Sequence, residues 1–172
     1  MVCVLAARMG EAQDRAAAPE GYGKAHFGMT VAQVRKAYPE LKEAPQVAGY
    51  LSHPNLKRYV LWHQKLEGLA KPADVELRFW RDSLWTVLFY CGENNFDDVK
   101  VQLSKQYGLP ASGGADPTWL WPTRTLMTAS KGGWYSIADR EIGKDAQATL
   151  AREAHQPLPK TQNPASPDGA QK

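Results

Sequence analysis

The chain has 172 residues, of which 43% are hydrophobic, a length and composition typical of a protein with one hydrophobic core. Its 21 Lys and Arg against 18 Asp and Glu give a net charge of +3, and the basic residues are scattered, so we expect no nucleic-acid partner. The four histidines are dispersed and the two cysteines, Cys3 and Cys91, lie far apart. The sequence therefore contains no spacing typical of metal ligands, and we expect no metal or other cofactor.

Residues 1–24 begin with a short apolar run, Val2 to Ala7, and continue as an Ala-rich polar stretch. This order resembles the end of a secretory signal peptide followed by a spacer, although no basic segment precedes the apolar run. We interpret 1–24 as a signal-like or disordered segment and expect a periplasmic or extracellular protein, with a cytoplasmic protein as the alternative. A lipidated Cys3 is a further interpretation, but Val2 is not the small residue that precedes a lipid-attachment site.

The first predicted helix begins abruptly in the stretch HFGMTVAQVRKAYPEL, which starts at His26. Thr30 has the side chain and position of an N-cap, and Gln33 completes a capping box, while Gly28 permits a sharp change of chain direction. Apolar residues then recur every three or four positions, which indicates an amphipathic helix. The proline of this stretch predicts that the helix ends within the two residues before it.

Two segments, 58–69 and 73–92, are rich in β-branched and aromatic residues and alternate with a period of two, so both are predicted to be strands. The second segment reverses at a polar turn, Arg81 to Ser83, which predicts a hairpin. Its return strand, 84–90, is apolar on both faces. We therefore expect this strand to be central in the sheet.

A second helix is predicted within residues 94–110. Asn94 or Asn95 is its expected N-cap, and a Gly-Leu-Pro sequence ends it. Asp97 and Asp98 fall in its first turn, where the helix dipole favours negative charge, and this role is a simpler explanation for them than metal binding.

Two further strands are predicted at 118–130 and 132–142, followed by a last helix at 144–154. This order predicts an α+β domain, residues 25–154, in which an antiparallel sheet carries short helices packed on one face. The first two helices each end on a Tyr before a Pro-containing stop, so a tandem αβ duplication is one interpretation. Residues 155–172 are Pro-rich and predict a disordered tail, and no segment has the ~18 apolar residues of a membrane span.

The phrase FGMTVAQV, residues 27–34, is similar to the GMT-x-x-Q/E-V helix start of small bacterial envelope proteins. It resembles the SmpA/OmlA kind of outer-membrane-assembly lipoprotein and the β-lactamase-inhibitor-protein type of fold. The resemblance implies helices packed on a small antiparallel sheet, and a protein that binds other proteins and catalyses no reaction. The chain departs from these patterns because it has neither a clear lipid-attachment site nor the paired cysteines of the inhibitor-type domains.

Tryptophan is unusually frequent, with six residues in the chain. Trp80 lies on the strand face opposite the apolar residues, so we expect it to be an exposed anchor for a partner protein, with Glu76 and Arg78 at the rim. Trp119 and Trp121 alternate on one face of a predicted strand. They either fill the interface between sheet and helix or form a binding platform.

Enzymatic function is supported only weakly by the sequence. His53 and His63 have no nearby Ser, Cys or carboxylate at the spacing of a triad, and Cys91 is expected to be a buried, unreactive thiol. The leading prediction is a non-enzymatic protein-binding or structural module of the bacterial cell envelope that acts through an open sheet face. The alternative is a small hydrolase or transferase whose site is assembled from dispersed residues such as His63 and Asp139.

Overall fold

The computed structural model describes residues 17–45, 53–112, 114, 116–129 and 132–154. Residues 1–16 of the predicted signal-like segment 1–24, including Cys3, and the Pro-rich tail 155–172 lie outside the described residues. Residues 17–24 are described and are not wholly irregular, since Gly21 and Tyr22 form a strand and Ala18 and Tyr22 pack against the core. The elements, in chain order, are β1 (Gly21–Tyr22), β2 (Ala25–His26), α1 (Val31–Ala37), β3 (Lys42–Glu43), β4 (Leu56–Gln64), β5 (Ala73–Trp80), β6 (Ser83–Tyr90), the 3-10 turn η2 (Glu93–Asn95), α2 (Phe96–Tyr107), β7 (Thr118–Leu120), β8 (Arg124–Ala129), β9 (Trp134–Asp139) and α3 (Arg140–Ala154). None of the described helices has the length and hydrophobicity needed to cross a bilayer.

Seven strands form one antiparallel sheet in the order β3-β4-β5-β6-β9-β8-β7, and β1 and β2 form a separate two-stranded ribbon. The predicted α+β class is therefore confirmed. So is the central place of β6, which pairs with β5 on one side and β9 on the other. The predicted hairpin is also present, and its two linking residues, Arg81 and Asp82, have φ of 47° and 65°. Positive φ at both positions is the geometry of a type I′ turn, whose twist matches that of paired strands.

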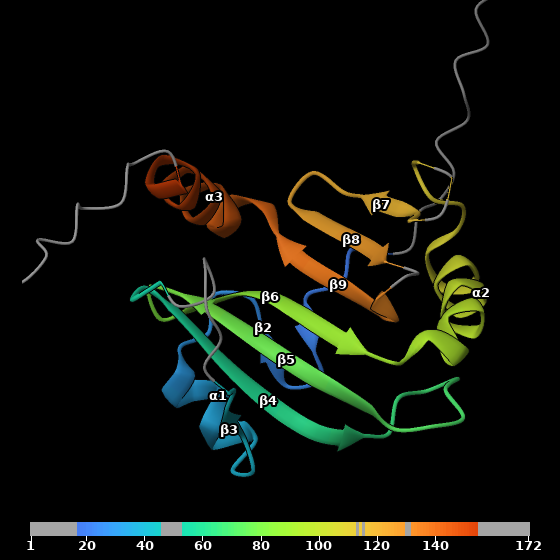
Figure 1. Ribbon diagram of the computed structural model, residues 1–172, viewed down its shortest axis with the longest axis horizontal. Coiled ribbons are helices and arrows are strands. Elements are labelled where there is room, and N and C mark those ends of the chain that lie inside the picture. The colour runs from blue at the N-terminus through green and yellow to red at the C-terminus, as the bar shows by residue number, and fades with distance from the viewer. Residues whose placement is uncertain (1–16, 46–52, 113, 115, 130–131, 155–172) are drawn as a thin grey trace, which may run out of the picture.

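The main core lies on the face of the sheet that we call the inner face, where α1, α2 and the β1-β2 ribbon contribute their apolar side chains. Its fully buried members include Val34 of α1 and Leu77, Phe79, Val87 and Leu126 of the sheet. The opposite side is the outer face, toward the viewer in Figure 1, with β1 and β2 behind the sheet. The helices were expected on one face, and α1 and α2 both join the inner-face core.

Helix α3 instead packs over one end of the outer face. A small second core joins Ala146 and Leu150 of α3 to Leu56, Trp80 and Trp85 of the sheet. Figure 1 shows α3 over one corner of the sheet, while no other helix of the described residues lies over the outer face. The outer face is thus divided into a covered part and an open part.

The start and end of α1 are those predicted from the sequence. The Gln33 N–H donates to the Thr30 hydroxyl (3.2 Å), and the Thr30 N–H donates to the Gln33 side chain (2.8 Å), which completes the capping box. Gly28 has φ of 86°, a conformation that residues with a Cβ rarely adopt. Its N–H donates to the Leu84 carbonyl, so this turn also fixes α1 against β6.

The later elements differ from expectation in three places. Helix α2 ends before Gly108 as predicted, but the Asn95 side chain donates to the Cys91 carbonyl and does not cap the helix. The single strand predicted at 118–130 is two strands, β7 and β8, on either side of a turn that contains Pro122. Helix α3 starts four residues earlier than predicted because Asp139 accepts from the N–H groups of the first turn and acts as its N-cap.

Candidate functional site

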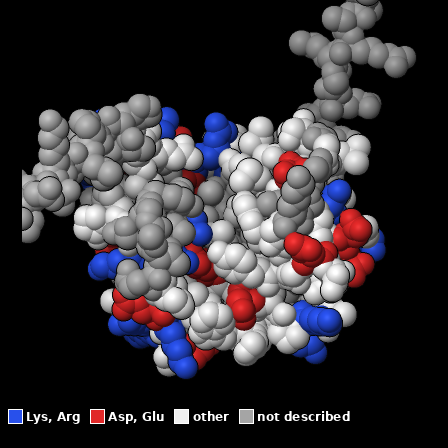
Figure 2. All heavy atoms as spheres, viewed as in Figure 1, with Lys and Arg blue, Asp and Glu red and all other residues white. Residues whose placement is uncertain are grey.

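The open part of the outer face exposes large apolar side chains that a folded domain usually covers. Trp62, Tyr90 and Met127 are 43%, 37% and 41% exposed, and strand alternation places all three on this face. Figure 2 shows uncharged side chains over much of the middle of the face, interrupted by acidic groups, with Lys and Arg mainly toward its margins. Exposed aromatic and methionine side chains on one face are typical of interaction sites.

A groove runs along this face beside α3 and has two adjoining compartments. The helix compartment, about 360 Å³, lies between α3 and strands β8 and β9; the sheet compartment, about 390 Å³, lies over β5, β6 and β9. Both are within the size range of ligand-binding pockets. The two compartments share the side chains of Trp85, Met127, Ser136 and Ala138.

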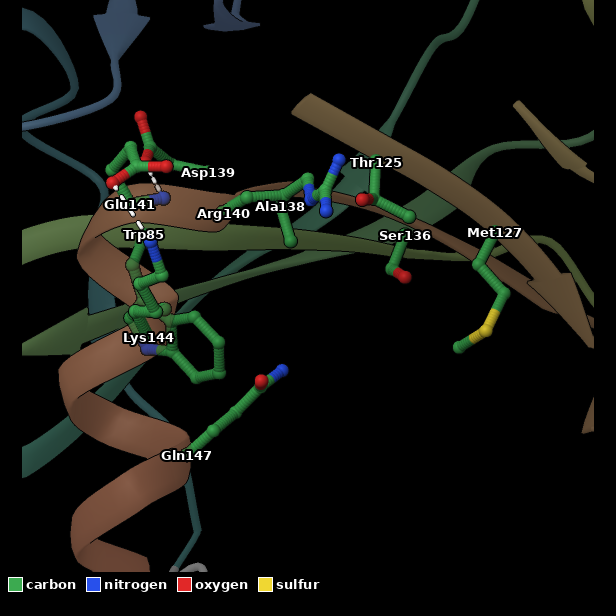
Figure 3. A pocket seen from close by; sticks show the side chains of 11 residues that line it. Trp85, Thr125, Met127, Ser136, Ala138, Asp139, Arg140, Glu141, Lys144 and Gln147 are labelled. Carbon is green, nitrogen blue, oxygen red and sulfur yellow. Dashed lines mark hydrogen bonds and ion pairs between the residues drawn. The ribbon is translucent and has the colours of Figure 1, made fainter. Parts of the chain in front are cut away.

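Trp85 lines both compartments of the groove and packs against α3 because of a β-bulge. The register moves from Arg78↔Thr86 to Phe79↔Leu84, which leaves Trp85 as the extra residue and turns its ring to the outer face. A Cβ at Gly143 of α3 would lie 3.2 Å from that ring, so the glycine permits the close approach of helix and indole. In Figure 3 the indole stands beside α3, and Met127 and Ser136 point into the space next to it.

A buried ion cluster lies under the sheet compartment. Glu76, 2% exposed, accepts from Arg58 at both carboxylate oxygens (2.9 and 2.7 Å), from Arg78 Nε (2.6 Å) and from the Tyr90 hydroxyl (3.3 Å). Burial alone would raise the pKa of Glu76, but the hydrogen bonds and charges of the two arginines outweigh burial and lower it. Burial and the nearby Glu76 charge raise the pKa of Tyr90, so its hydroxyl stays protonated and donates.

The expected exposure of Trp80 is wrong. Trp80 does lie on the outer face, but it is 2% exposed because α3 covers it. Its indole N–H donates to Asp145 of α3 (2.8 Å), and its ring packs against His53 with 4.9 Å between ring centroids. The residues expected at its rim are also not at a rim, since Glu76 is buried and the Arg78 side chain is only 13% exposed.

The structure places Trp119 and Trp121 in the interface between sheet and helix and not on a binding platform. They are 3% and 9% exposed and belong to the inner-face core. The indole N–H of Trp119 donates to the Gly108 carbonyl at the end of α2, and the ring of Trp121 meets Tyr107 edge-on. Neither residue reaches the groove.

The predicted site residues did not include those that form the open surface, which are Trp62, Trp85, Tyr90, Met127 and Trp134. One signal for them was present in the sequence. The return strand 84–90 is apolar on both faces, and Tyr90 lies at the end of the face opposite the main core. An apolar face of this kind is either covered by another part of the chain or left exposed as a binding surface. The sequence did not indicate that α3 covers only one end of it.

The structure does not bring the candidate catalytic residues together. His63 lies on β4 with a largely exposed side chain, next to Asp74. Asp139 lies at the end of β9, separated from β4 by β5 and β6, where it caps α3 and pairs with Arg124. Cys91 is buried as expected, and burial raises the pKa of its thiol. Within the part of the chain that the structure describes, no three His, Cys, Asp or Glu side chains gather as a metal site would require.

No protein-family model, curated protein or solved structure matches this chain. The function is therefore inferred from the geometry of the outer face and its groove.

Proposed function

We propose that the protein is a non-enzymatic protein-binding module of the bacterial cell envelope, and that the open part of the outer face is its binding surface. One observation supports this proposal above all: Trp62, Tyr90 and Met127 stay exposed on one side of the sheet although the chain has a helix, α3, on that same side. Aromatic residues and methionine are enriched at the centres of protein interfaces.

The rigidity of this surface also favours binding. Tyr90 is held from below by its hydrogen bond to Glu76, and Met127 lies on β8, which pairs on both sides with β7 and β9. A backbone held in paired strands has little conformational entropy left to lose when a partner covers it, so more of the contact energy remains as affinity.

The envelope location rests on the sequence alone. The signal-like first residues and the helix start at 27–34, which resembles that of small envelope proteins, both support it. The resemblance also supports protein binding without catalysis.

Site-specific photo-crosslinking in bacterial cells tests the proposal. A benzophenone amino acid is placed at Met127 in the groove and, as a matched control, at Val101 on α2, which is 52% exposed but lies away from the outer face. We expect a discrete adduct from Met127 that is absent from Val101 and that unlabelled wild-type protein competes away. The same adducts from both positions, or none from Met127, would contradict the proposed surface.

A further inference from the structure

Arg78 brings an unused hydrogen-bonding edge to the sheet compartment. Its Nε donates to Glu76 (2.6 Å), and the residue lines the compartment. Among the residues that the structure describes, none accepts from its two terminal nitrogens. The guanidinium therefore keeps the planar pair of donors that matches a carboxylate, and it is already fixed in orientation by Glu76.

Thr86 provides a second, independent sign of a ligand. It lies directly across from Arg78 on β6 and lines the same compartment. It is 6% exposed, and its hydroxyl has no hydrogen-bond partner among the described residues; the indole N–H of neighbouring Trp85 has none either. Buried polar groups are almost always paired, so the unpaired Thr86 hydroxyl opposite an unused arginine edge points to an acceptor that binds from outside.

The charge of the cluster favours an anion. Two arginines, Arg58 and Arg78, surround one carboxylate, Glu76, so the three side chains carry a net charge of +1. Leu88, Trp134 and Met127 line the compartment around this charge and lower the local dielectric constant, which strengthens its attraction for an opposite charge.

This inference rests on the proposed function. We infer that the sheet compartment binds an Asp or Glu side chain from an internal segment of the partner protein, with an adjacent large apolar side chain packed on Tyr90 and Met127. The carboxylate pairs with the free edge of Arg78, and a rotation of the Thr86 side chain about χ1 adds its hydroxyl. An internal segment fits better than a chain end because the two compartments adjoin in one groove, which lets an extended chain pass through.

Three short peptides test the inference by NMR: acetyl-Gly-Phe-Glu-Gly-amide, the same peptide with Gln in place of Glu, and acetyl-Gly-Phe-Gly with a free terminal carboxylate. The six tryptophan indole N–H signals of the ¹⁵N-labelled protein are the readout. Trp85 and Trp134 line the groove, whereas Trp80 and Trp119 donate to Asp145 and Gly108 outside it and serve as internal controls.

We expect the Glu peptide to shift the Trp85 and Trp134 signals and to bind about tenfold or more tightly than the Gln peptide. Arg78→Gln should reduce its affinity to that of the Gln peptide. The variant keeps its fold because Arg58 still donates to both oxygens of Glu76. Arg81→Gln is the matched control, since it removes the same charge from an arginine that pairs with Asp145 and does not line the groove; its affinity should be unchanged.

Equal binding of the Glu and Gln peptides, or equal losses in the two arginine variants, would overturn the carboxylate site. Preference for the free terminal acid alone would overturn the internal segment as its source. No shift of Trp85 or Trp134 with any peptide would also overturn the inference. None of these outcomes removes the proposed protein-binding surface, which fails separately if Met127 gives no specific crosslink.

Discussion

Replacing Trp80 with Ala should destabilise the protein strongly, because Trp80 holds α3 on the sheet. The indole is 2% exposed, lies between Leu56 and Ala146, and donates to Asp145 on α3. A surface anchor would behave in the opposite way, with little effect on folding and a large effect on binding. The variant therefore distinguishes the position found in the structure from the one expected from the sequence.

The size of the effect follows from the buried area. A tryptophan side chain that buries about 200 Å² contributes about 5 kcal/mol at about 25 cal/mol per Å², and measured truncations of buried aromatic residues to alanine cost about 3–5 kcal/mol. We expect Trp80→Ala to lower the free energy of unfolding by about 4 kcal/mol. Loss of the hydrogen bond to Asp145 adds little, because that carboxylate is about half exposed and keeps its ion pair with Arg81.

Trp62→Ala is the matched control, since Trp62 lies on the same face and is 43% exposed. Its loss should cost about three-fifths as much by the same area argument. Urea unfolding followed by far-ultraviolet circular dichroism measures both variants against wild type. Equal losses in the two variants, or a loss below about 1 kcal/mol for Trp80→Ala, would refute the packing of α3 over Trp80.

Three further predictions concern folding. Thr30→Ala removes the capping box of α1 and should lower the free energy of unfolding by about 1 kcal/mol; an unchanged urea midpoint would show that the cap is unimportant. A Cβ at Gly133 would lie 2.5 Å from the backbone of Gly92, whereas a Cβ at Gly28 would meet open space. Gly133→Ala should therefore lower the melting temperature further than Gly28→Ala. The reverse order would be inconsistent with this contact. The pKa of Glu76 is lowered in the folded state, so its stabilising contribution is present above the ordinary glutamate pKa of about 4.3 and is lost as the pH falls through the folded value. The difference in unfolding free energy between wild type and Glu76→Gln should accordingly shrink on acidification, and a constant difference would contradict the arginine pairing.

The features predicted correctly from the sequence are those that short segments determine. The cap of α1 depends on Thr30 and Gln33, three residues apart, and the β5-β6 hairpin depends on a polar turn between two alternating strands. Even the central position of β6 follows from its own composition, because a strand that is apolar on both faces is typical of the middle of a sheet. No knowledge of distant segments was needed for any of these.

The features that were missed depend on contacts between distant segments. Trp80 is buried by α3, whose contacting residue Asp145 comes 65 positions later. The alternation along β5 therefore predicted correctly on which face of the sheet Trp80 lies, but it could not predict that Trp80 is buried. The cluster around Glu76 requires the register that places Arg58 opposite Arg78, and alternation alone does not fix register. The start of α3 was missed because the role of Asp139, the last residue of β9, as an N-cap was not recognised, so the predicted strand extended to residue 142.

The central claim is that the protein acts through the open outer face. The most direct test is to measure by calorimetry the affinity of the purified partner, identified through its Met127 crosslink, for wild type, Met127→Glu and Val101→Glu. Both substitutions add one charge at an exposed apolar residue, one in the groove and one on α2. We predict a loss of about tenfold or more for Met127→Glu and no change for Val101→Glu; unchanged affinity in both variants, or an equal loss in both, would contradict the claim.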